Sequence, residues 1–419
     1  MNVSTLKTLQ DFDVTGKKVL LRVAYDFSLK EENGKIISPD HARIRDTIPT
    51  IQYLLERGCS IGLLSWLKRP NGTVEEKLRM KPVAEKLSEL LGKPVEALND
   101  CVGAEVEARV QSMQSGEILM LENVRFHSEE DLGDDSFAKA LTSGFDCIVF
   151  DAFAQAHRTS ASVVGIVKHL PACLGLLMQK ELEIFGDLVN SPEHPFVVVM
   201  GGAKISDKVG ILKVFVEKAD CILIGGALAN TFFSAQGVQV AKSMIDDVSK
   251  LVSGNVVDDP FAAAREILDA GSTTLSLGDA QVDKVQLPLD LVAASGVDST
   301  ETVIVNIDKG EVIPEGYSFL DIGPRTIDLY KRALMGARMI FANGPMGLFE
   351  KSSFEKGTQS VARAIIDSGA RSVLGGGDTE SMITKFGMDG KFTHVSTGGG
   401  AALEFLAGQE FEVLKYLTK

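Results

Sequence analysis

The segment Phe196-Val-Val-Val-Met-Gly-Gly-Ala-Lys-Ile-Ser-Asp-Lys208 runs from five apolar residues through a glycine pair into a polar stretch. A short apolar run bounded by glycine is typical of a buried strand, and the turn exposes backbone N–H groups at the start of a following helix. Lys204 and Lys208 are four residues apart, so we expect them on one face of that helix near its N-terminus, where two positive charges favour a bound anion. An exposed lysine pair without a ligand is the alternative. The segment is not a Walker A loop, because Gly-x-x-x-x-Gly-Lys-Ser/Thr occurs nowhere in the chain.

On both sides of this segment, short β-rich runs alternate with longer amphipathic stretches. This alternation predicts an α/β fold in which parallel sheets are wrapped by helices. Strands are expected at 18–22, 60–65, 118–122 and 147–151 in the first half, and at 196–200, 221–224, 302–306, 339–342, 372–374 and 393–395 in the second. Helices are expected at 43–57, 82–91 and 135–143.

The length of 419 residues is too great for one hydrophobic core and predicts two domains. A stretch with apolar residues at helical spacing, Leu176–Leu188, precedes Ser191-Pro192-Glu193-His194-Pro195, which ends the helix. We therefore place the domain boundary there, with the helix as connector.

Composition limits the possible partners. The formal net charge of −14 should repel nucleic acid and anionic membranes, so an anion site must be a local basic pocket. The five cysteines show no Cys-x-x-Cys spacing, which favours buried free thiols in a reducing cytoplasm. The N-terminus lacks the pattern of a signal peptide, and the uncharged stretch Cys221–Ala241 is too polar and glycine-rich for a membrane span.

Cations and glycine turns are divided between the two halves. In the first half, arginines stand near the ends of strand-like runs or at helix starts: Arg22, Arg43, Arg69, Arg125 and Arg158. Converging guanidinium groups suit a small, multiply charged anion. The second half carries glycine turns at 201–202, 225–226, 343–345, 375–378 and 398–400, which suit the phosphates of a nucleotide. This division suggests a two-domain kinase.

The turn Gly375-Gly376-Gly377-Asp378-Thr379 combines backbone donors, a hydroxyl and a carboxylate that could bind Mg²⁺. A tight turn without a ligand is the alternative, although a second copy at Gly398-Gly399-Gly400 favours a binding role. Taken alone, Glu350 is expected to be a solvated carboxylate.

The motifs together resemble the phosphoglycerate kinase family. They are Leu121-Glu-Asn-Val-Arg-Phe-His127, Asp151-Ala-Phe…Ala-His157-Arg158, Gly201-Gly-Ala-Lys204…Asp-Lys208, Asn343-Gly-Pro…Gly…Phe-Glu350, Gly375-Gly-Gly-Asp-Thr379 and His394-Val-Ser-Thr-Gly-Gly-Gly-Ala401. They occur in order over about residues 18–408, which is nearly the whole chain.

The resemblance implies two Rossmann-like, doubly wound domains joined by a hinge helix. Residues 1–185 would bind 3-phosphoglycerate, 186–407 would bind Mg²⁺ with ADP or ATP, and the tail 408–419 would pack back on the first domain. The implied reaction moves a phosphoryl group between 1,3-bisphosphoglycerate and ADP, and domain closure brings the substrates together. The implied enzyme is a cytoplasmic monomer that needs neither nucleic acid nor membrane.

The resemblance also implies roles for single residues. Arg43, Lys204 and Lys208 would be catalytic, with Arg43 stabilising the phosphoryl group in flight. The acid would be bound by Arg22, Asp26, Arg43, Trp66, Arg69, Arg125, His157 and Arg158. The nucleotide would be bound by Lys204, Lys208, Asn343, Glu350, Gly376, Gly377, Asp378, Thr379, Gly398 and Gly399, with Asp378 also binding the metal.

Departures from the family pattern lie on the acid side. Arg-Val-Asp-Phe-Asn has become Arg22-Val-Ala24-Tyr-Asp26, and Ser-His-Leu-Gly-Arg-Pro has become Ser65-Trp66-Leu-Lys68-Arg69-Pro70. The second histidine of Ala-His-Arg-Ala-His has become Ser160. A lost hydrogen bond to a charged ligand costs about 1.5–3 kcal/mol, so the changes could weaken acid binding about 100-fold unless Lys68 compensates.

Three hypotheses follow. The first is an active phosphoglycerate kinase with a remodelled acid pocket. The second is a nucleotide-binding relative without the glycolytic activity, and the third is a kinase of another small acid. The retained arginines and lysines favour the first.

Overall fold

The computed structural model describes all residues except 1–2, 28, 33–34, 38–41 and 247–258. The chain divides into two compact units. The N-terminal unit consists of residues 1–186 together with 409–419, and the C-terminal unit of residues 187–408. Helix α6 (Leu176–Asn190), predicted as a connector, runs through the boundary between residues 186 and 187.

The N-terminal unit is built on a parallel six-stranded sheet in the order β5-β6-β4-β1-β7-β8. Its strands are β1 (Lys18–Val23), β4 (Ser60–Leu64), β5 (Glu96–Ala97), β6 (Ile118–Met120), β7 (Cys147–Asp151) and β8 (Ala172–Leu174). The four predicted strands are confirmed, whereas β5 and β8 are too short to show an apolar run. Strands β4 and β7 are buried along their whole length, because helices cover both faces of a parallel sheet.

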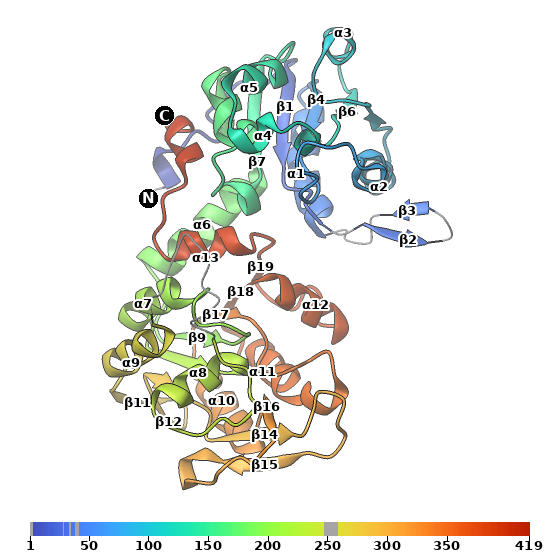
Figure 1. Cartoon of the computed structure of the whole chain (residues 1–419). Coiled ribbons are helices and arrows are strands. Elements are labelled where there is room, and N and C mark those ends of the chain that lie inside the picture. The colour runs from blue at the N-terminus through green and yellow to red at the C-terminus, as the bar shows by residue number, and fades with distance from the viewer. Residues whose placement is uncertain (1–2, 28, 33–34, 38–41, 247–258) are drawn as a thin grey trace. The chain divides into compact units, whose positions relative to one another are not determined.

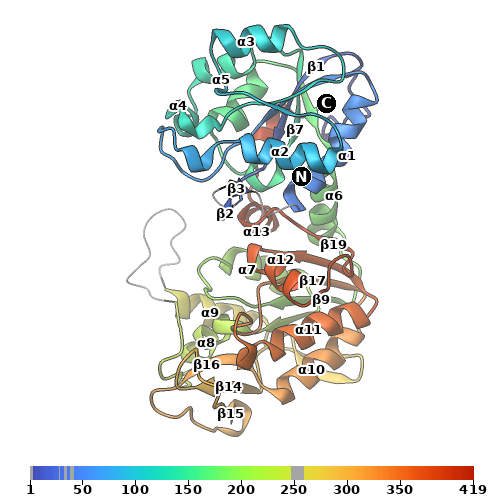
Figure 2. The same ribbon diagram turned by 90° about the vertical axis from the view of Figure 1, so that its right-hand side faces the viewer.

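Helices connect these strands on both sides of the sheet: α1 (Ala42–Leu55), α2 (Lys81–Leu91), α3 (Ala104–Gln111), α4 (Glu129–Leu132) and α5 (Asp135–Leu141). Figure 1 shows α1 and α2 on one side of β1 and α4 and α5 on the other, and Figure 2 shows α1 and α2 from the front. The predicted helices are confirmed to within two residues at each end. A hairpin, β2 (Lys30–Glu32) and β3 (Lys35–Ile37), follows β1.

The C-terminal unit contains a second parallel sheet in the order β13-β10-β9-β17-β18-β19. The strands are β9 (Phe196–Met200), β10 (Cys221–Ile224), β13 (Val285–Gln286), β17 (Met339–Asn343), β18 (Arg371–Gly375) and β19 (His394–Val395). Numbered along the chain, this is the order 3-2-1-4-5-6 of doubly wound nucleotide-binding sheets. The predicted fold class is confirmed.

One predicted strand lies elsewhere. The run at 302–306 was expected to join the parallel sheet, but β15 (Val303–Asn306) pairs antiparallel with β14 (Asp290–Ala294), which pairs antiparallel with β16 (Ser318–Ile322). Its partly exposed residues explain the error, because a strand inside a helix-covered sheet would be buried throughout. A further hairpin joins β11 (Thr274–Leu277) to β12 (Ala280–Asp283).

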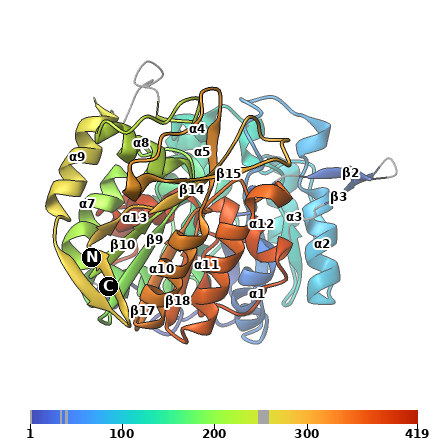
Figure 3. The ribbon, with the colours of Figure 1, turned by 90° about the horizontal axis from the view of Figure 1, so that it is seen from below.

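The helices of the C-terminal unit are α7 (Val209–Lys218), α8 (Gly226–Ala235), α9 (Pro260–Ala270), α10 (Pro324–Met335), α11 (Lys356–Asp367), α12 (Gly377–Lys385) and α13 (Gly400–Leu406). In Figure 3, α7 and α9 lie on one side of the parallel sheet and α10 and α11 on the other. The placement of Lys204 and Lys208 on one helix face is wrong, because α7 begins only at Val209. Lys204 lies in the preceding loop, and Lys208 is the residue just before the helix.

The last residues of the chain pack on the first ones (Figure 1). The Lys7 N–H donates to the Leu417 carbonyl at 2.7 Å, and the Lys419 N–H donates to the Thr5 carbonyl at 2.9 Å. All five cysteines are buried and free, as predicted. Among the described residues, no helix combines the length and apolar character needed to cross a membrane.

Candidate active site

The acid-side candidates follow the carboxyl ends of neighbouring parallel strands. Arg22 lies near the end of β1, Trp66 follows β4, and Arg125 lies in a short turn of helix, Val124–Phe126, after β6. Parallel strands end at one edge of a sheet, where ligands of such folds bind. The topology therefore gathers residues that are more than 100 positions apart in the sequence.

Arg22 is the most deeply placed of these cations, with an exposed fraction of 0%. Its Nε donates to the Ser162 carbonyl at 2.9 Å and to Ser162 Oγ at 3.2 Å. Ser162 is held by the buried Glu130 carboxylate, which accepts from its N–H at 2.8 Å and from its Oγ at 2.7 Å. Burial lowers the pKa of Arg22 to about 9, against the opposing effect of Glu130, so the guanidinium stays charged at neutral pH. Sequence reasoning missed Glu130 and Ser162, although the acidic run Glu129–Asp131 next to an arginine motif was a usable signal.

Trp66 joins two of the arginines. The Arg22 guanidinium carbon lies 4.4 Å, and that of Arg125 4.2 Å, from the centre of the indole ring. Arg125 is also fixed at its edge, because Nη1 donates to the Lys68 carbonyl at 2.8 Å and Nε to Asp131 at 3.2 Å. Both distances are in the range of cation–π interactions, in which the face of the aromatic ring attracts a cation.

Asp26 holds the other side of this cluster. Its carboxylate accepts from Trp66 Nε1 at 3.3 Å and from the Lys68 N–H at 3.0 Å. Its backbone carbonyl accepts from the guanidinium of Arg43, which lies in the first turn of α1. Asp26 is therefore a carboxylate satisfied by two hydrogen bonds from its neighbours.

The remaining acid-side candidates are Arg69, Arg158 and His157. Arg69 and Arg158 are exposed, and the contacts of the described residues tie neither side chain to the cluster. His157 is half-buried, its ring centre is 6.3 Å from that of Phe411, and burial followed by the charge of Arg158 lowers its pKa to about 4. The changed positions Ala24 and Ser160 are both buried.

Two glycine turns of the C-terminal unit meet after β9 and β17. These strands are first and fourth of the sheet in chain order, but they are neighbours within the sheet. The Gly201 N–H donates to the Asn343 carbonyl at 2.8 Å, and the Gly202 N–H donates to the Pro345 carbonyl at 2.9 Å. Gly344 has φ +82, and a side chain there would come within 2.7 Å of the Gly201 carbonyl oxygen. Only glycine allows these two turns to approach so closely.

Asn343 and Thr379 tie this junction to the next strand. Asn343 Nδ2 donates to the Gly375 carbonyl at 2.9 Å, and Thr379 Oγ1 donates to the same oxygen at 2.8 Å. Gly376 precedes α12 with φ +105, and a side chain there would reach 2.9 Å from Asn343 Nδ2. The backbone of Gly376 and Gly377 and the exposed Asp378 thus form the first turn of a helix, where anions are stabilised.

Lys208 lies against the glycine turn, because a carbon added at Gly202 would be 3.3 Å from its Nζ. Burial lowers the pKa of Lys208, while Asp207 and Asp378 act in the opposite direction. Lys204 is exposed in the loop, and Glu350 is exposed in a turn after Phe349. Gly398 and Gly399 lie directly before α13, where Gly399 has φ +55.

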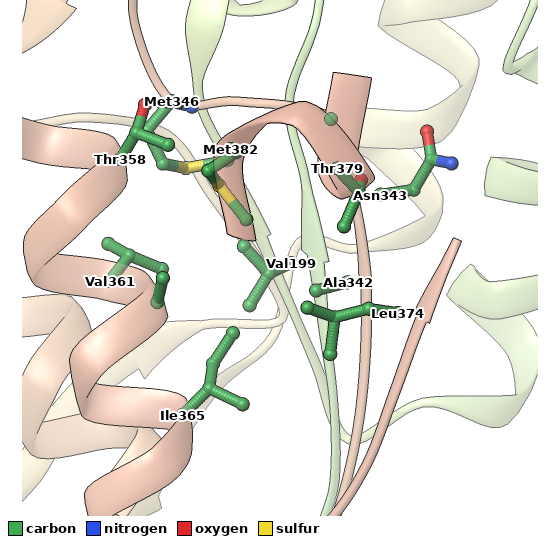
Figure 4. A pocket seen from close by; sticks show the side chains of 12 residues that line it. Val199, Ala342, Asn343, Met346, Thr358, Val361, Ile365, Leu374, Thr379 and Met382 are labelled. Carbon is green, nitrogen blue, oxygen red and sulfur yellow. Dashed lines mark hydrogen bonds between the residues drawn. The ribbon is translucent and has the colours of Figure 1, made fainter. Parts of the chain in front are cut away.

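An apolar pocket lies behind these turns, between the sheet and helices α11 and α12 (Figure 4). Val199, Ala342 and Leu374 from the strands face Val361, Ile365 and Met382 from the helices. Its interior of about 20 Å³ holds about one water molecule, so it cannot receive a nucleotide. The nucleotide candidates lie at its rim, through Asn343 and Thr379.

Comparison with known proteins decides the family. Residues 9–409 match the family described as phosphoglycerate kinase. This chain belongs to the phosphoglycerate kinase family. The phosphoglycerate kinase of Pelotomaculum thermopropionicum is 44% identical over 412 residues, and that of Dictyoglomus turgidum is 43% identical over 412 residues. Each alignment covers 98% of this chain and 98% of the relative.

Solved structures of the family agree. The phosphoglycerate kinase of Coxiella burnetii matches with a TM-score of 0.81 and 32% identity, and that of Pyrococcus horikoshii with 0.81 and 35%. Each match covers 98% of both chains. The predicted family and the activity of a glycolytic phosphotransferase that uses ATP and ADP are confirmed, and a relative without that activity is not favoured.

Proposed function

We propose that the N-terminal unit binds 3-phosphoglycerate or 1,3-bisphosphoglycerate and that the C-terminal unit binds ADP or ATP, between which a phosphoryl group is transferred reversibly. The observation that carries this assignment is the different chemistry of the two sheet edges. One edge gathers guanidinium groups around Trp66, and the other gathers backbone turns around Gly201 and Gly344.

On the acid side, we assign direct contacts to Arg43, Arg69, Arg125, His157 and Arg158. Arg22 has no exposed surface, so its charge supports the pocket from beneath the indole. The Arg43 guanidinium lies in the first turn of α1, next to the Asp26 carbonyl, and is assigned to the phosphoryl group in transfer.

On the nucleotide side, the first turn of α12 and the loop 201–208 are assigned to the phosphates. Lys208 is held half-buried against the Gly202 turn, which favours the loss of water from its ammonium group on phosphate binding. Lys204 is assigned to the transferred group and Glu350 to the ribose hydroxyls. Gly398 and Gly399 are assigned to the nucleotide as a second glycine turn.

The residues of α12 fit Mg²⁺. Asp378 is an exposed carboxylate beside the backbone donors of Gly376 and Gly377, and Mg²⁺ in kinases is typically bound by one or two carboxylates together with substrate phosphates. When bound, the ion neutralises charge on the phosphates.

Phosphoryl transfer does not require the protein to form a covalent bond with the substrate. Phosphoryl transfer passes through a loose transition state with charge spread over equatorial oxygens, so catalysis depends on positioning and on electrostatic stabilisation. Arg43, Lys204 and Lys208 supply that stabilisation without accepting a proton. The five buried free cysteines support a reducing cytoplasm.

Turnover with 3-phosphoglycerate, ATP and Mg²⁺, coupled to oxidation of NADH through a dehydrogenase that consumes 1,3-bisphosphoglycerate, tests the proposal. We expect magnesium-dependent turnover at about 1–100 s⁻¹. Tight ATP binding without turnover, or turnover only with a different acid, would contradict it.

A further inference from the structure

Two neighbouring residues of the acid-side edge, Trp66 and Lys68, are held by one carboxylate. Asp26 accepts a hydrogen bond from the Trp66 indole at 3.3 Å and another from the Lys68 N–H at 3.0 Å. All three residues stand at positions where the chain departs from its family pattern. They therefore form a single contact network.

We propose that Trp66 is a positioning residue of the acid-binding surface, held in place by Asp26. The proposal rests on the proposed function, in which Arg125 binds the acid. Trp66 is 2% exposed, so it offers almost no surface to a substrate and acts through the arginines that it contacts.

The guanidinium groups of Arg22 and Arg125 both lie against the indole of Trp66. Arg22 Nη2 is buried and finds no hydrogen-bond partner among the residues that the structure describes. The indole ring, whose centre lies 4.4 Å away from its guanidinium carbon, provides the compensating contact. The same ring lies beside Arg125, so an indole that shifts would move both cations.

The backbone of Lys68 links Asp26 to Arg125. Lys68 has φ +53, in the left-handed region that residues with a side chain seldom adopt. Its N–H is held by Asp26, and its carbonyl accepts from Arg125 Nη1 at 2.8 Å. Asp26 and Arg125 therefore fix this residue from opposite sides, and loss of the Asp26 carboxylate should release the loop that holds Arg125.

Three substitutions separate the contributions. Trp66→Phe keeps an aromatic face but loses the N–H donor, Trp66→Leu loses both, and Asp26→Asn places an amide donor opposite one of the two N–H groups. We expect KM for 3-phosphoglycerate to rise about 10-fold in Trp66→Phe and in Asp26→Asn, and more in Trp66→Leu. KM for ATP should stay within about twofold. The effects of Trp66→Phe and Asp26→Asn should be less than additive in the double variant, because the hydrogen bond between Trp66 and Asp26 can be lost only once.

Trp66 is the single tryptophan of the chain, so its fluorescence reports on this site alone. Emission of the unmodified protein should change on titration with 3-phosphoglycerate, and emission of Asp26→Asn should be shifted to the red without ligand. The matched control is Tyr53→Leu, which removes the ring under Arg57 at 3.5 Å elsewhere in the same unit and should leave KM for the acid unchanged.

The outcomes are distinguishable. If Arg125→Ala raises KM for the acid while the folded Trp66→Phe and Asp26→Asn variants keep the wild-type value, the positioning role is overturned and the proposed function stands. If Arg125→Ala also leaves KM unchanged and the fluorescence does not respond to the acid, the acid site itself lies elsewhere. Should Trp66→Leu fail to fold, Asp26→Asn and the fluorescence titration decide the question.

Discussion

Arg43 is the residue through which the acid-side cluster is expected to act on the reaction. Its guanidinium donates to the Asp26 carbonyl from the first turn of α1. Arg43→Ala should lower kcat about 10³-fold, because it removes charge stabilisation needed in the transition state, and should leave the Kd of ADP unchanged. The measurement is steady-state kinetics with calorimetric titration of ADP. Arg45→Ala, at an exposed position of the same helix, is the control, and equal losses in both variants would contradict the role.

His157 makes stability depend on pH. Burial, then the charge of Arg158, lowers its pKa from 6.5 to about 4, so the fold favours the neutral ring while the unfolded chain still binds a proton. Its contribution is complete above about pH 6.5 and is lost as the pH falls toward 4. We expect the free energy of unfolding to fall less steeply over this interval in His157→Gln than in the wild type. Urea unfolding at several pH values measures this, and parallel curves would show that the imidazole has no such effect.

At the scale of elements, helix α12 is the element whose first turn we propose to hold the nucleotide phosphates and the metal. Asp378 is exposed there, while Thr379 is occupied with the Gly375 carbonyl at 2.8 Å. Asp378→Ala should weaken binding of Mg-ADP about 10-fold and leave metal-free ADP binding nearly unchanged, because one carboxylate ligand of the metal is lost. Calorimetry with and without Mg²⁺ checks this. Asp389→Ala, in the exposed turn after the helix, should bind like the wild type, and an equal loss without Mg²⁺ would remove Asp378 from the metal site.

At the scale of the whole molecule, the two ends of the chain belong to one unit. Phe411 is 2% exposed and its ring centre lies 6.0 Å from that of Phe153. Phe411→Ala should destabilise the N-terminal unit by about 3 kcal/mol, because a buried aromatic ring leaves a cavity, without changing the Kd of ADP. Hydrogen exchange of the β1 and β7 amides and calorimetry separate the two effects. The control is Tyr416→Ala, at a more exposed ring of the same segment. It should lower the free energy of unfolding by only about 0.5 kcal/mol.

Residue patterns predicted nine strands of the two parallel sheets, the helices α1, α2, α5 and α6, and the division of the chain into an arginine-rich and a glycine-rich half. Strands such as Cys147–Asp151 and Phe196–Met200 are buried along their whole length. Each is therefore visible in the sequence as a continuous apolar run, without knowledge of its neighbours in space. The sequence also pointed to the family, because the motifs that carry the resemblance are contiguous stretches of chain. Short strands such as β5 and β8 were missed, because two or three residues are too few to show a pattern of hydrophobicity.

Which of these residues meet depends on the order of the strands in the folded sheet. Asp26 and Trp66 are 40 positions apart, and no spacing rule announces the hydrogen bond between them. The burial of Arg22 beneath the indole depends likewise on Ser162, 140 positions away. The carboxyl edge of a parallel sheet is assembled from loops that are distant in the sequence, so the pairing of charges at this edge is a property of strand order and not of any one segment.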